Sequence, residues 1–282
     1  SNFKIQYLPL ILLLVTISWI PLIIRWHFLL ANCKIHIPFT KSILVYLSGT
    51  ALQITPGQIG ELIKAQILKT GFNIPRTKTA SVVLVEKVYD LIGAIVASII
   101  GIIILELEIY LIILAVFILF LIFFFIYYKP AFEFFLRRII KMKFFSKYTE
   151  NISESYEVIK KSTTPKVAIF CIFLSITYWF IVSVAVYYTL LAFDVDILNY
   201  LKVLSIFTTS TILGAITFIP GGIGVTEGTI AGLFVLEGIH MSTALVLSVL
   251  IRIVTLWYNV GIGFIALKLS NGFSFKKDFP KE

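Results

Sequence analysis

The chain has 282 residues, of which 59% are hydrophobic and only 14% are charged, and its mean hydropathy is +0.99. Soluble domains keep about a quarter of their residues charged, so this composition excludes an ordinary soluble domain and indicates an all-α polytopic membrane protein. The net charge of +9 does not indicate nucleic-acid binding, because the basic residues lie between apolar runs, where membrane topology places them.

Five apolar runs reach the length of about 20 residues that a membrane-spanning helix needs. They cover about 5–30, 79–104, 108–128, 165–192 and 241–270. Two further apolar segments, 39–70 and 199–236, are each interrupted by Pro-Gly. We expect each of these to be a helix, a break and a second short helix that returns to its starting side, although a full hairpin fits the lengths equally well.

The Lys and Arg residues predict how the chain is oriented. Segment 129–166 contains nine of them and is therefore expected in the cytoplasm. Tracing the spans from there places the 193–199 loop outside and the C-terminus inside. We therefore expect one multi-pass domain, 1–282, in the cell membrane, with a cytoplasmic connector at 129–164 between halves at about 5–128 and 165–270.

The two interrupted segments carry the same motif. Residues 56–61 read PGQIGE and residues 220–227 read PGGIGVTE, and Gly49 and Gly214 precede the two prolines by seven and six residues. Three predicted spans separate the motifs, and an odd number turns the second unit upside down relative to the first. This predicts an inverted repeat with re-entrant, discontinuous helices, an arrangement that places a transport site near the membrane midplane.

The composition of each break suggests what it binds. Proline begins a helix well, and glycines let a ligand approach the backbone. The unpaired N–H groups of a first helical turn and the positive end of the helix dipole favour an anion. The alternative is that the glycines only permit tight helix packing. Packing alone does not explain the proline and the glutamates, so we expect two helix starts to converge on an interior polar site.

Charged residues lie inside two predicted spans. Glu86 and Asp90 are four residues apart and share a helix face, where Lys87 can neutralise one of them. Arg252 lies near the middle of the last span, where it costs at least about 2.5–3.5 kcal/mol and needs a partner. The candidate partners are Glu86, Asp90, Glu61 and Glu227. Either these groups form a structural buried pair, or Arg252 holds a phosphate with Lys64 while the carboxylates balance charge or carry a proton.

No nucleotide-binding, nucleophile-elbow or HExxH motif is present, so we expect no enzymatic activity, no metal and no cofactor. Cys33 and Cys171 have no metal-type spacing and are expected to be small apolar residues. The four tryptophans are expected to face lipid or to pack in the core: Trp19, Trp26, Trp179 and Trp257.

Several motifs together resemble a known family. They are Arg25-Trp26, PGQIGELIKA, EKVYD, PGGIGVTEG and the helix that carries Arg252. Over about residues 10–270 they are similar to the membrane domain of lysylphosphatidylglycerol synthases, which is shared with AglD-type archaeal glycosyltransferases and stand-alone flippase-like proteins. In the two-domain synthases this region resembles the part that flips aminoacylated lipid.

The chain departs from that family in three ways. Lys64 and Lys87 stand where the family commonly has Arg, which weakens a bidentate phosphate contact. The family usually has one more helix before Arg25, so we expect the native N-terminus to lie upstream of Ser1. No soluble domain follows residue 270, so aminoacyl or glycosyl transfer by this chain alone is not expected.

Our leading hypothesis is a membrane lipid translocase, or flippase, for a phosphate-bearing lipid such as a phospholipid or a polyprenyl-phosphate carrier. An ion-coupled small-solute transporter and a membrane subunit of a lipid-linked glycosyl or aminoacyl transferase are the alternatives. Proton or ion coupling and homo-oligomerisation stay open. The predicted substrate-binding residues are Pro56, Gly57, Gly60, Glu61, Lys64, Glu86, Asp90, Pro220, Gly221, Gly222, Gly224, Glu227 and Arg252.

Overall fold

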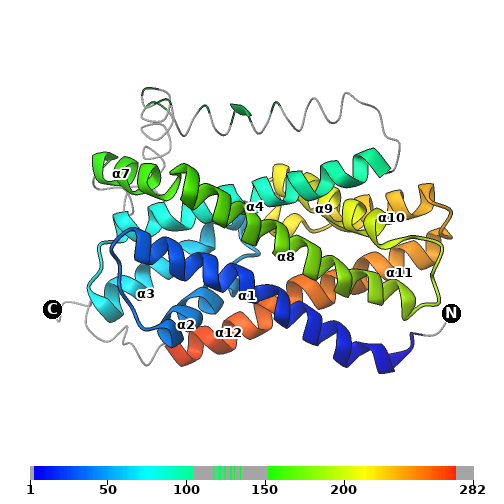
Figure 1. Ribbon diagram of the computed structural model, residues 1–282. Coiled ribbons are helices and arrows are strands. Elements are labelled where there is room, and N and C mark those ends of the chain that lie inside the picture. The colour runs from blue at the N-terminus through cyan, green and yellow to red at the C-terminus, as the bar shows by residue number, and fades with distance from the viewer. Residues whose placement is uncertain are drawn as a thin grey trace.

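The computed structural model describes residues 3–104 and 152–270, with a few isolated positions between them, and every element in these two ranges is a helix. The predicted span 108–128, most of the connector 129–164 and the tail after residue 270 lie outside the described residues. The helices form an elongated bundle, with the N-terminus at one end and α3 and α7 at the other (Figure 1).

Three helices in the described ranges are long and apolar enough to cross a membrane, at Ile5–Asn32, Pro165–Leu191 and Met241–Ser270. They confirm the spans predicted at 5–30, 165–192 and 241–270. The first contains α1 (Leu8–Asn32) and the second is α8 (Pro165–Leu191). The third comprises α11 (Met241–Arg252), a π-helical turn (Ile253–Trp257) and α12 (Tyr258–Ser270).

The predicted span 79–104 lies within α4 (Arg76–Ile104), which has 29 residues and is therefore about 43 Å long. It carries Glu86, Lys87 and Asp90 in its interior. Helices α3 (Ile63–Phe72), α8 and α9 (Tyr200–Ile216) all contact α4. Its charged side chains therefore have protein partners within the bundle.

Both interrupted segments are broken at their Pro-Gly pairs. The first consists of α2 (Phe39–Thr50), a 3₁₀ turn (Pro56–Leu62) and α3, and the second of α9, a 3₁₀ turn (Pro220–Gly222) and α10 (Val225–Leu236). Left-handed backbone lies in both turns: φ is 58° at Gly57 and 62° at Gly221, a region that glycine enters without steric cost. The two turns contact each other, so the breaks of the two halves meet inside the bundle.

The glycine upstream of each break has a packing role. A Cβ atom at Gly49 would lie 2.8 Å from the Cγ of Lys64, and one at Gly214 would clash with the hydroxyl of Thr226. Gly49 therefore lets α2 approach α3, and Gly214 lets α9 approach α10. Tight packing accounts for these two glycines, whereas Gly57, Gly221 and Gly222 within the turns are needed for their left-handed backbone conformation.

The polar ends of the bundle are well separated. At the end nearest the N-terminus, Lys4 pairs with Asp194 at 2.5 Å. At the other end, residues 33–36, 72–78 and α7 (Ile152–Ser162) surround a surface cavity of about 440 Å³, which is lined by Lys34, Lys78 and Lys161. The 193–199 loop, expected outside, and α7 of the connector, expected in the cytoplasm, thus lie at opposite ends of the bundle (Figure 1).

Candidate functional site

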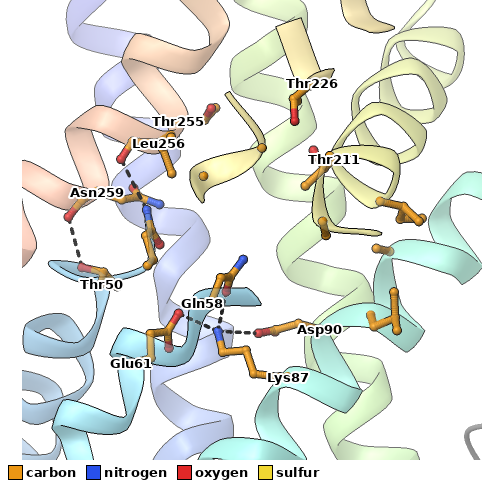
Figure 2. A pocket seen from close by; sticks show the side chains of 18 of the residues that line it. Thr50, Gln58, Glu61, Lys87, Asp90, Thr211, Thr226, Thr255, Leu256 and Asn259 are labelled. Carbon is orange, nitrogen blue, oxygen red and sulfur yellow. Dashed lines mark hydrogen bonds and ion pairs between the residues drawn. The ribbon is translucent and has the colours of Figure 1, made fainter. Parts of the chain in front are cut away.

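A cavity of about 370 Å³, the central cavity, lies where the two breaks meet. Gly57 from the first break and Gly221 and Gly222 from the second form part of its wall. Figure 2 shows its polar side chains, which come from both halves of the chain. At the rim, Phe218 and Ile219 are 66% and 41% exposed, so apolar surface continues from the cavity to the outside of the bundle.

Four charged side chains line the central cavity, and each of them is paired. They are Glu61, Lys87, Asp90 and Arg252. Uncharged donors and acceptors lie around them (Figure 2). These are Thr50, Gln53, Gln58, Thr211, Thr226, Thr255 and Asn259.

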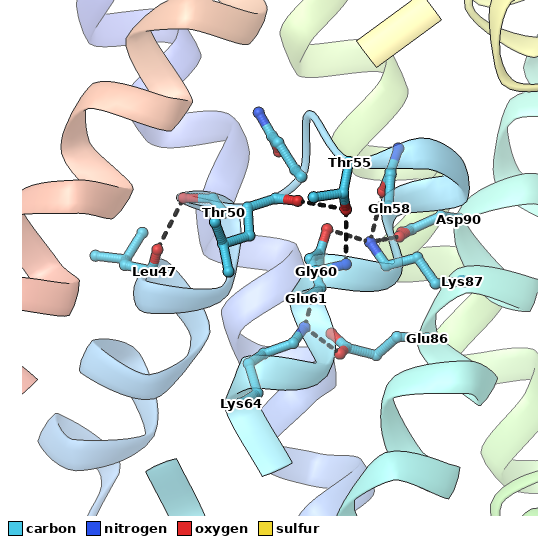
Figure 3. Close-up of polar contacts among 12 residues, drawn as sticks. Leu47, Thr50, Thr55, Gln58, Gly60, Glu61, Lys64, Glu86, Lys87 and Asp90 are labelled. Carbon is cyan, nitrogen blue, oxygen red and sulfur yellow. Dashed lines mark hydrogen bonds and ion pairs between the residues drawn. The ribbon is translucent and has the colours of Figure 1, made fainter. Parts of the chain in front are cut away.

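Next to the cavity, six charged side chains form a closed ring of alternating sign, here called the ion-pair ring. Its nitrogen–oxygen distances follow in order around the ring: Lys64–Glu61 2.9 Å, Glu61–Lys87 2.6 Å, Lys87–Asp90 3.3 Å, Asp90–Arg25 2.6 Å, Arg25–Glu86 3.8 Å and Glu86–Lys64 2.7 Å. Figure 3 shows the part of the ring on the first break and α4. With three cations and three carboxylates, the ring as a whole is neutral.

Sequence spacing positions most of the ring. Glu61 and Lys64 are three residues apart where the first break enters α3, so their side chains lie on the same face. Glu86 and Asp90, one helical turn apart on α4, both contact Arg25 of α1. This confirms the shared face predicted for the two carboxylates.

The ring has a buried side and a side that faces the cavity. The side chains of Arg25 and Lys64 are fully buried and that of Glu86 is 1% exposed, whereas Lys87 and Asp90 are 27% and 25% exposed. Charges this deep are tolerated because each is compensated by opposite charge and hydrogen bonds. Only the cavity side of the ring is therefore within reach of a ligand.

Arg252 forms a separate pair on the second half. Its Nε donates to Glu227 at 2.8 Å and its Nη2 donates to the carbonyl of Gly221. Of the four partners that the sequence allowed, the structure selects Glu227. The guanidinium is thus fixed against the second break while it also lines the cavity.

The backbone N–H groups at the breaks differ from the expectation. The N–H of Gly224 donates to Glu227 at 2.6 Å, and the N–H of Gly60 donates to the hydroxyl of Thr55 at 2.6 Å. The chain's own side chains therefore occupy these two groups, and the prediction that they are open to an external anion is wrong for them. For Gly224 the sequence did carry a signal, because Glu227 stands three residues into α10, where a glutamate can reach back to the N–H at the helix start.

The π-helical turn after Arg252 connects the last span to the first break. Gln53 donates to the carbonyl of Leu256 at 3.3 Å, and Thr50 donates to the carbonyl of Asn259 at 3.1 Å (Figure 2). A π-helical turn frees carbonyl groups from regular helical bonding and is frequent at functional sites. Here it holds the loop after α2 against the helix that carries Arg252.

The structure brings six of the thirteen predicted site residues to the cavity wall: Gly57, Glu61, Asp90, Gly221, Gly222 and Arg252. The others support the site from outside the wall. Lys64 and Glu86 form the buried side of the ring, and Glu227 holds Arg252. Pro56 and Pro220 begin the two turns, and Gly60 and Gly224 lie where the turns lead into α3 and α10.

Sequence reasoning missed several wall and support residues. Arg25 appeared only as part of a family motif, and Lys87 only as a neutralising charge. Trp19 and Trp179, expected to face lipid or to pack, line the cavity, and the indole N–H of Trp179 donates to the carbonyl of Asp90 at 3.1 Å. For Lys87, the signal was its place between two carboxylates on one helix.

No group of three or more His, Cys, Asp or Glu side chains in the described part of the chain is placed to hold a metal ion. Cys33 and Cys171 are buried free thiols, as predicted. The site consists of paired charges, amide and hydroxyl groups, and glycine backbone that borders the cavity. These groups can recognise a polar headgroup through charge and hydrogen bonds.

Comparisons with known proteins agree with this architecture. Residues 1–263 match the family described as the lysylphosphatidylglycerol synthase TM region. The chain is similar to a UPF0104 membrane protein of Pyrococcus horikoshii, with 26% identity over 287 residues that cover 92% of this chain and 85% of that protein. It is also similar to a UPF0104 membrane protein of Methanothermobacter thermautotrophicus, with 30% identity over 92 residues that cover 33% of this chain and 27% of that protein. No solved structure matches the chain.

Proposed function

We propose that this chain, which belongs to the family of the lysylphosphatidylglycerol synthase TM region, is a translocase that moves a phosphate-bearing lipid between membrane leaflets. A phospholipid and a polyprenyl-phosphate carrier both fit this class. The partners are then membrane lipids, and the chain performs transport rather than group transfer.

One observation carries this proposal: the two Pro-Gly breaks meet at a single cavity that also holds Arg252 and Lys87. Irregular backbone in a membrane is tolerated where it is buried in protein or lines a polar cavity. Two cations and several amide and hydroxyl groups around such a cavity suit a phosphate headgroup. The exposed apolar rim at Phe218 and Ile219 lets the hydrocarbon tails remain in the bilayer.

The same rim favours a lipid over a small solute. A carrier for a water-soluble solute has to separate its polar site from the lipid, and a cavity bordered by exposed phenylalanine and isoleucine does not serve that purpose. In the transferase alternative, a donor-binding site is needed as well. The cavity supports the translocase more directly than either alternative.

In the proposed arrangement the two broken segments are the equivalent parts of an inverted repeat. Helices α3 and α10 then return to the sides from which α2 and α9 start, and the headgroup site lies between the repeats. The end of the bundle with Lys34, Lys78 and Lys161 faces the cytoplasm of a cell membrane, together with the connector 129–164 and the C-terminus. The N-terminal end, with Asp194, faces outward.

The test is lipid movement in liposomes that contain the purified protein. We expect fluorescent phosphatidylglycerol, or a labelled polyprenyl phosphate, to cross between leaflets faster than in protein-free liposomes. Arg252→Ala should abolish the acceleration. Arg76→Ala is the matched control, because Arg76 is also a hydrogen-bonded arginine but does not line the central cavity.

Two results would contradict the proposal. The first is a wild-type protein that accelerates no anionic lipid in liposomes of any composition tested. The second is acceleration that is equal in the wild type and in Arg252→Ala, since the cavity would then not be the route.

A further inference from the structure

The charges around the central cavity balance without a ligand. The ion-pair ring contains Arg25, Lys64 and Lys87 against Glu61, Glu86 and Asp90, and Arg252 is paired with Glu227. A phosphate diester that enters this cavity brings one negative charge with no matching positive charge. Burying an uncompensated charge in a protein costs several kcal/mol. Either the ligand supplies its own cation or the protein loses one negative charge.

One carboxylate in the ring is less well compensated than the other two. Both oxygens of Glu61 and both oxygens of Asp90 accept charged hydrogen bonds. Glu86 accepts only at Oε2, from Lys64, while its Oε1 is buried without a hydrogen-bond partner among the described residues.

The cation nearest to that free oxygen is bound elsewhere. Nη2 of Arg25 lies 3.8 Å from Oε1 of Glu86 but only 2.6 Å from Asp90, and Nη1 donates to Ser175 at 2.5 Å. The Nε of Arg25 is likewise buried without a partner in the described part of the chain. Buried polar atoms in native proteins are rarely left in this state without a reason.

We propose that Glu86 binds one proton at Oε1 when an anionic headgroup enters the central cavity, so that lipid movement is coupled to proton movement. This deepens the translocase function and rests on it. The proton adds to the carboxylate and gives a neutral carboxylic acid, and the ring changes from neutral to one net positive charge. That charge balances the phosphate.

The connections of the ring carry this change to the cavity. Lys64 is shared between Glu61 and Glu86, and Glu61 is shared between Lys64 and Lys87. When Glu86 is neutral, Lys64 depends on Glu61 alone and draws it away from Lys87. Lys87, which already lines the cavity, then keeps Asp90 and Gln58 but has one carboxylate fewer to neutralise it, so its ammonium group can bind the phosphate.

Whether Glu86 holds a proton depends on charged and titratable groups from every element around it. Tyr46 of α2 connects its surroundings with the cavity: the Tyr46 ring lines the cavity wall, and its centroid is 5.2 Å from Nζ of Lys64. The titratable and charged groups that act on Glu86 are Arg25 from α1, Tyr46 from α2, Glu61 from the first break, Lys64 from α3, Lys87 and Asp90 from α4, and Cys171 from α8.

The first test counts protons during ligand binding, independently of transport. Dihexanoyl phosphatidylglycerol, a soluble monoanion, is titrated into the full-length protein in detergent, by calorimetry in two buffers of different ionisation enthalpy. We expect uptake of about one proton per bound lipid at neutral pH. The zwitterion dihexanoyl phosphatidylcholine, which carries its own cation, should bind without proton uptake.

Glu86→Gln, which keeps the shape of the side chain, should bind phosphatidylglycerol with no proton uptake. Glu157→Gln, at an exposed carboxylate on α7, is the matched control and should behave as the wild type. If Glu86→Gln does not fold, infrared difference spectra of the wild type give a second measurement. Lipid binding should produce the carbonyl band of a protonated carboxylic acid.

The second test uses liposomes with an imposed pH gradient and a clamped membrane potential. Wild-type protein should accumulate labelled phosphatidylglycerol in the leaflet on the alkaline side, whereas Glu86→Gln should only equilibrate it. Lipid binding without proton uptake, or movement indifferent to the pH gradient, would overturn proton coupling and leave the translocase intact. Absence of both binding and movement would overturn the two proposals together.

Discussion

Lys64 holds the two buried carboxylates of the ion-pair ring, so Lys64→Met should be among the most damaging conservative substitutions in this chain. The side chain of Lys64 is fully buried, and its Nζ lies 2.9 Å from Glu61 and 2.7 Å from Glu86. Methionine keeps an unbranched stem past Gly49, with sulfur in place of Cδ, and lacks the ammonium group. The substitution therefore isolates the charge from the packing.

The expected loss follows from what remains. Glu61 still has Lys87 at 2.6 Å, but Glu86 loses its one hydrogen bond within the described part of the chain and keeps Arg25 at the longer distance of 3.8 Å. Removing one partner from a buried ion pair costs about 3–5 kcal/mol, because the other charge stays buried without compensation. Adding Glu86→Gln removes that charge, so the double variant should lose roughly 2 kcal/mol less unfolding free energy than the two single variants lose together.

The assay is equilibrium unfolding of the purified protein in mixed micelles, followed by helical circular dichroism as denaturing detergent is added. Lys69→Met is the matched control on the same helix. Among the described residues the ammonium group of Lys69 bonds only Asn73, so its replacement should cost less than about 1 kcal/mol of stability. If the free energy of unfolding of Lys64→Met lies within about 1 kcal/mol of the wild-type value, as expected for the Lys69→Met control, the ion-pair ring does not stabilise the fold as described.

Three further predictions concern packing, reactivity and orientation. A Cβ atom at Gly263 would clash with the backbone of Ala51, so Gly263→Ala should destabilise the protein by at least about 1–3 kcal/mol in the same unfolding assay. Gly228→Ala is the control: a Cβ atom there meets open space within α10, so the change should be neutral or stabilise the protein by up to about 1 kcal/mol. Equal effects of the two substitutions on stability would contradict the packing of α12 on α2. Burial raises the pKa of the Cys33 thiol, so at pH 7 maleimide should label it more slowly than the cysteine of His36→Cys. The difference between the two labelling rates should narrow above the ordinary thiol pKa of about 8.5, and equal rates at pH 7 would contradict the prediction. In intact cells an impermeant maleimide should label Asp196→Cys and not His36→Cys, and the reverse result would invert the proposed orientation.

The elements that the sequence predicted well are those fixed by local chemistry. Both breaks contain the predicted Pro-Gly pair: Pro56 and Pro220 begin the two 3₁₀ turns, and the glycine after each takes the left-handed backbone that a regular helix excludes. The helices before them have already ended, α2 at Thr50 and α9 at Ile216. The shared face of Glu86 and Asp90 follows from helical periodicity alone. The long apolar spans follow from length and hydropathy, with ends within two residues of the structure in the first case, 5–30 against Ile5–Asn32.

The pairing across helices could not be predicted in the same way. Arg25 meets Glu86 and Asp90 because α1 packs beside α4, and the sequence around Arg25 does not indicate which helix will be its neighbour. Four carboxylates were possible partners of Arg252, and spacing along the chain could not choose among them. Trp179 packs in the core, one of the two places expected for it, but hydropathy does not say that the same side chain also borders a cavity.

The two halves share a motif but carry opposite charge at corresponding positions, and this asymmetry bears on the mechanism. Glu86 follows the first proline by 30 residues, and Arg252 follows the second by 32. In the structure the carboxylate belongs to a ring with three cations, whereas the arginine has a single carboxylate and faces the cavity. In the proposed mechanism the second half therefore supplies the contact for the phosphate and the first half supplies the group that takes up the proton. The two breaks touch, and in this mechanism that contact transmits a change in charge on one half to the headgroup contact of the other, the coupling that a proton-driven translocase requires.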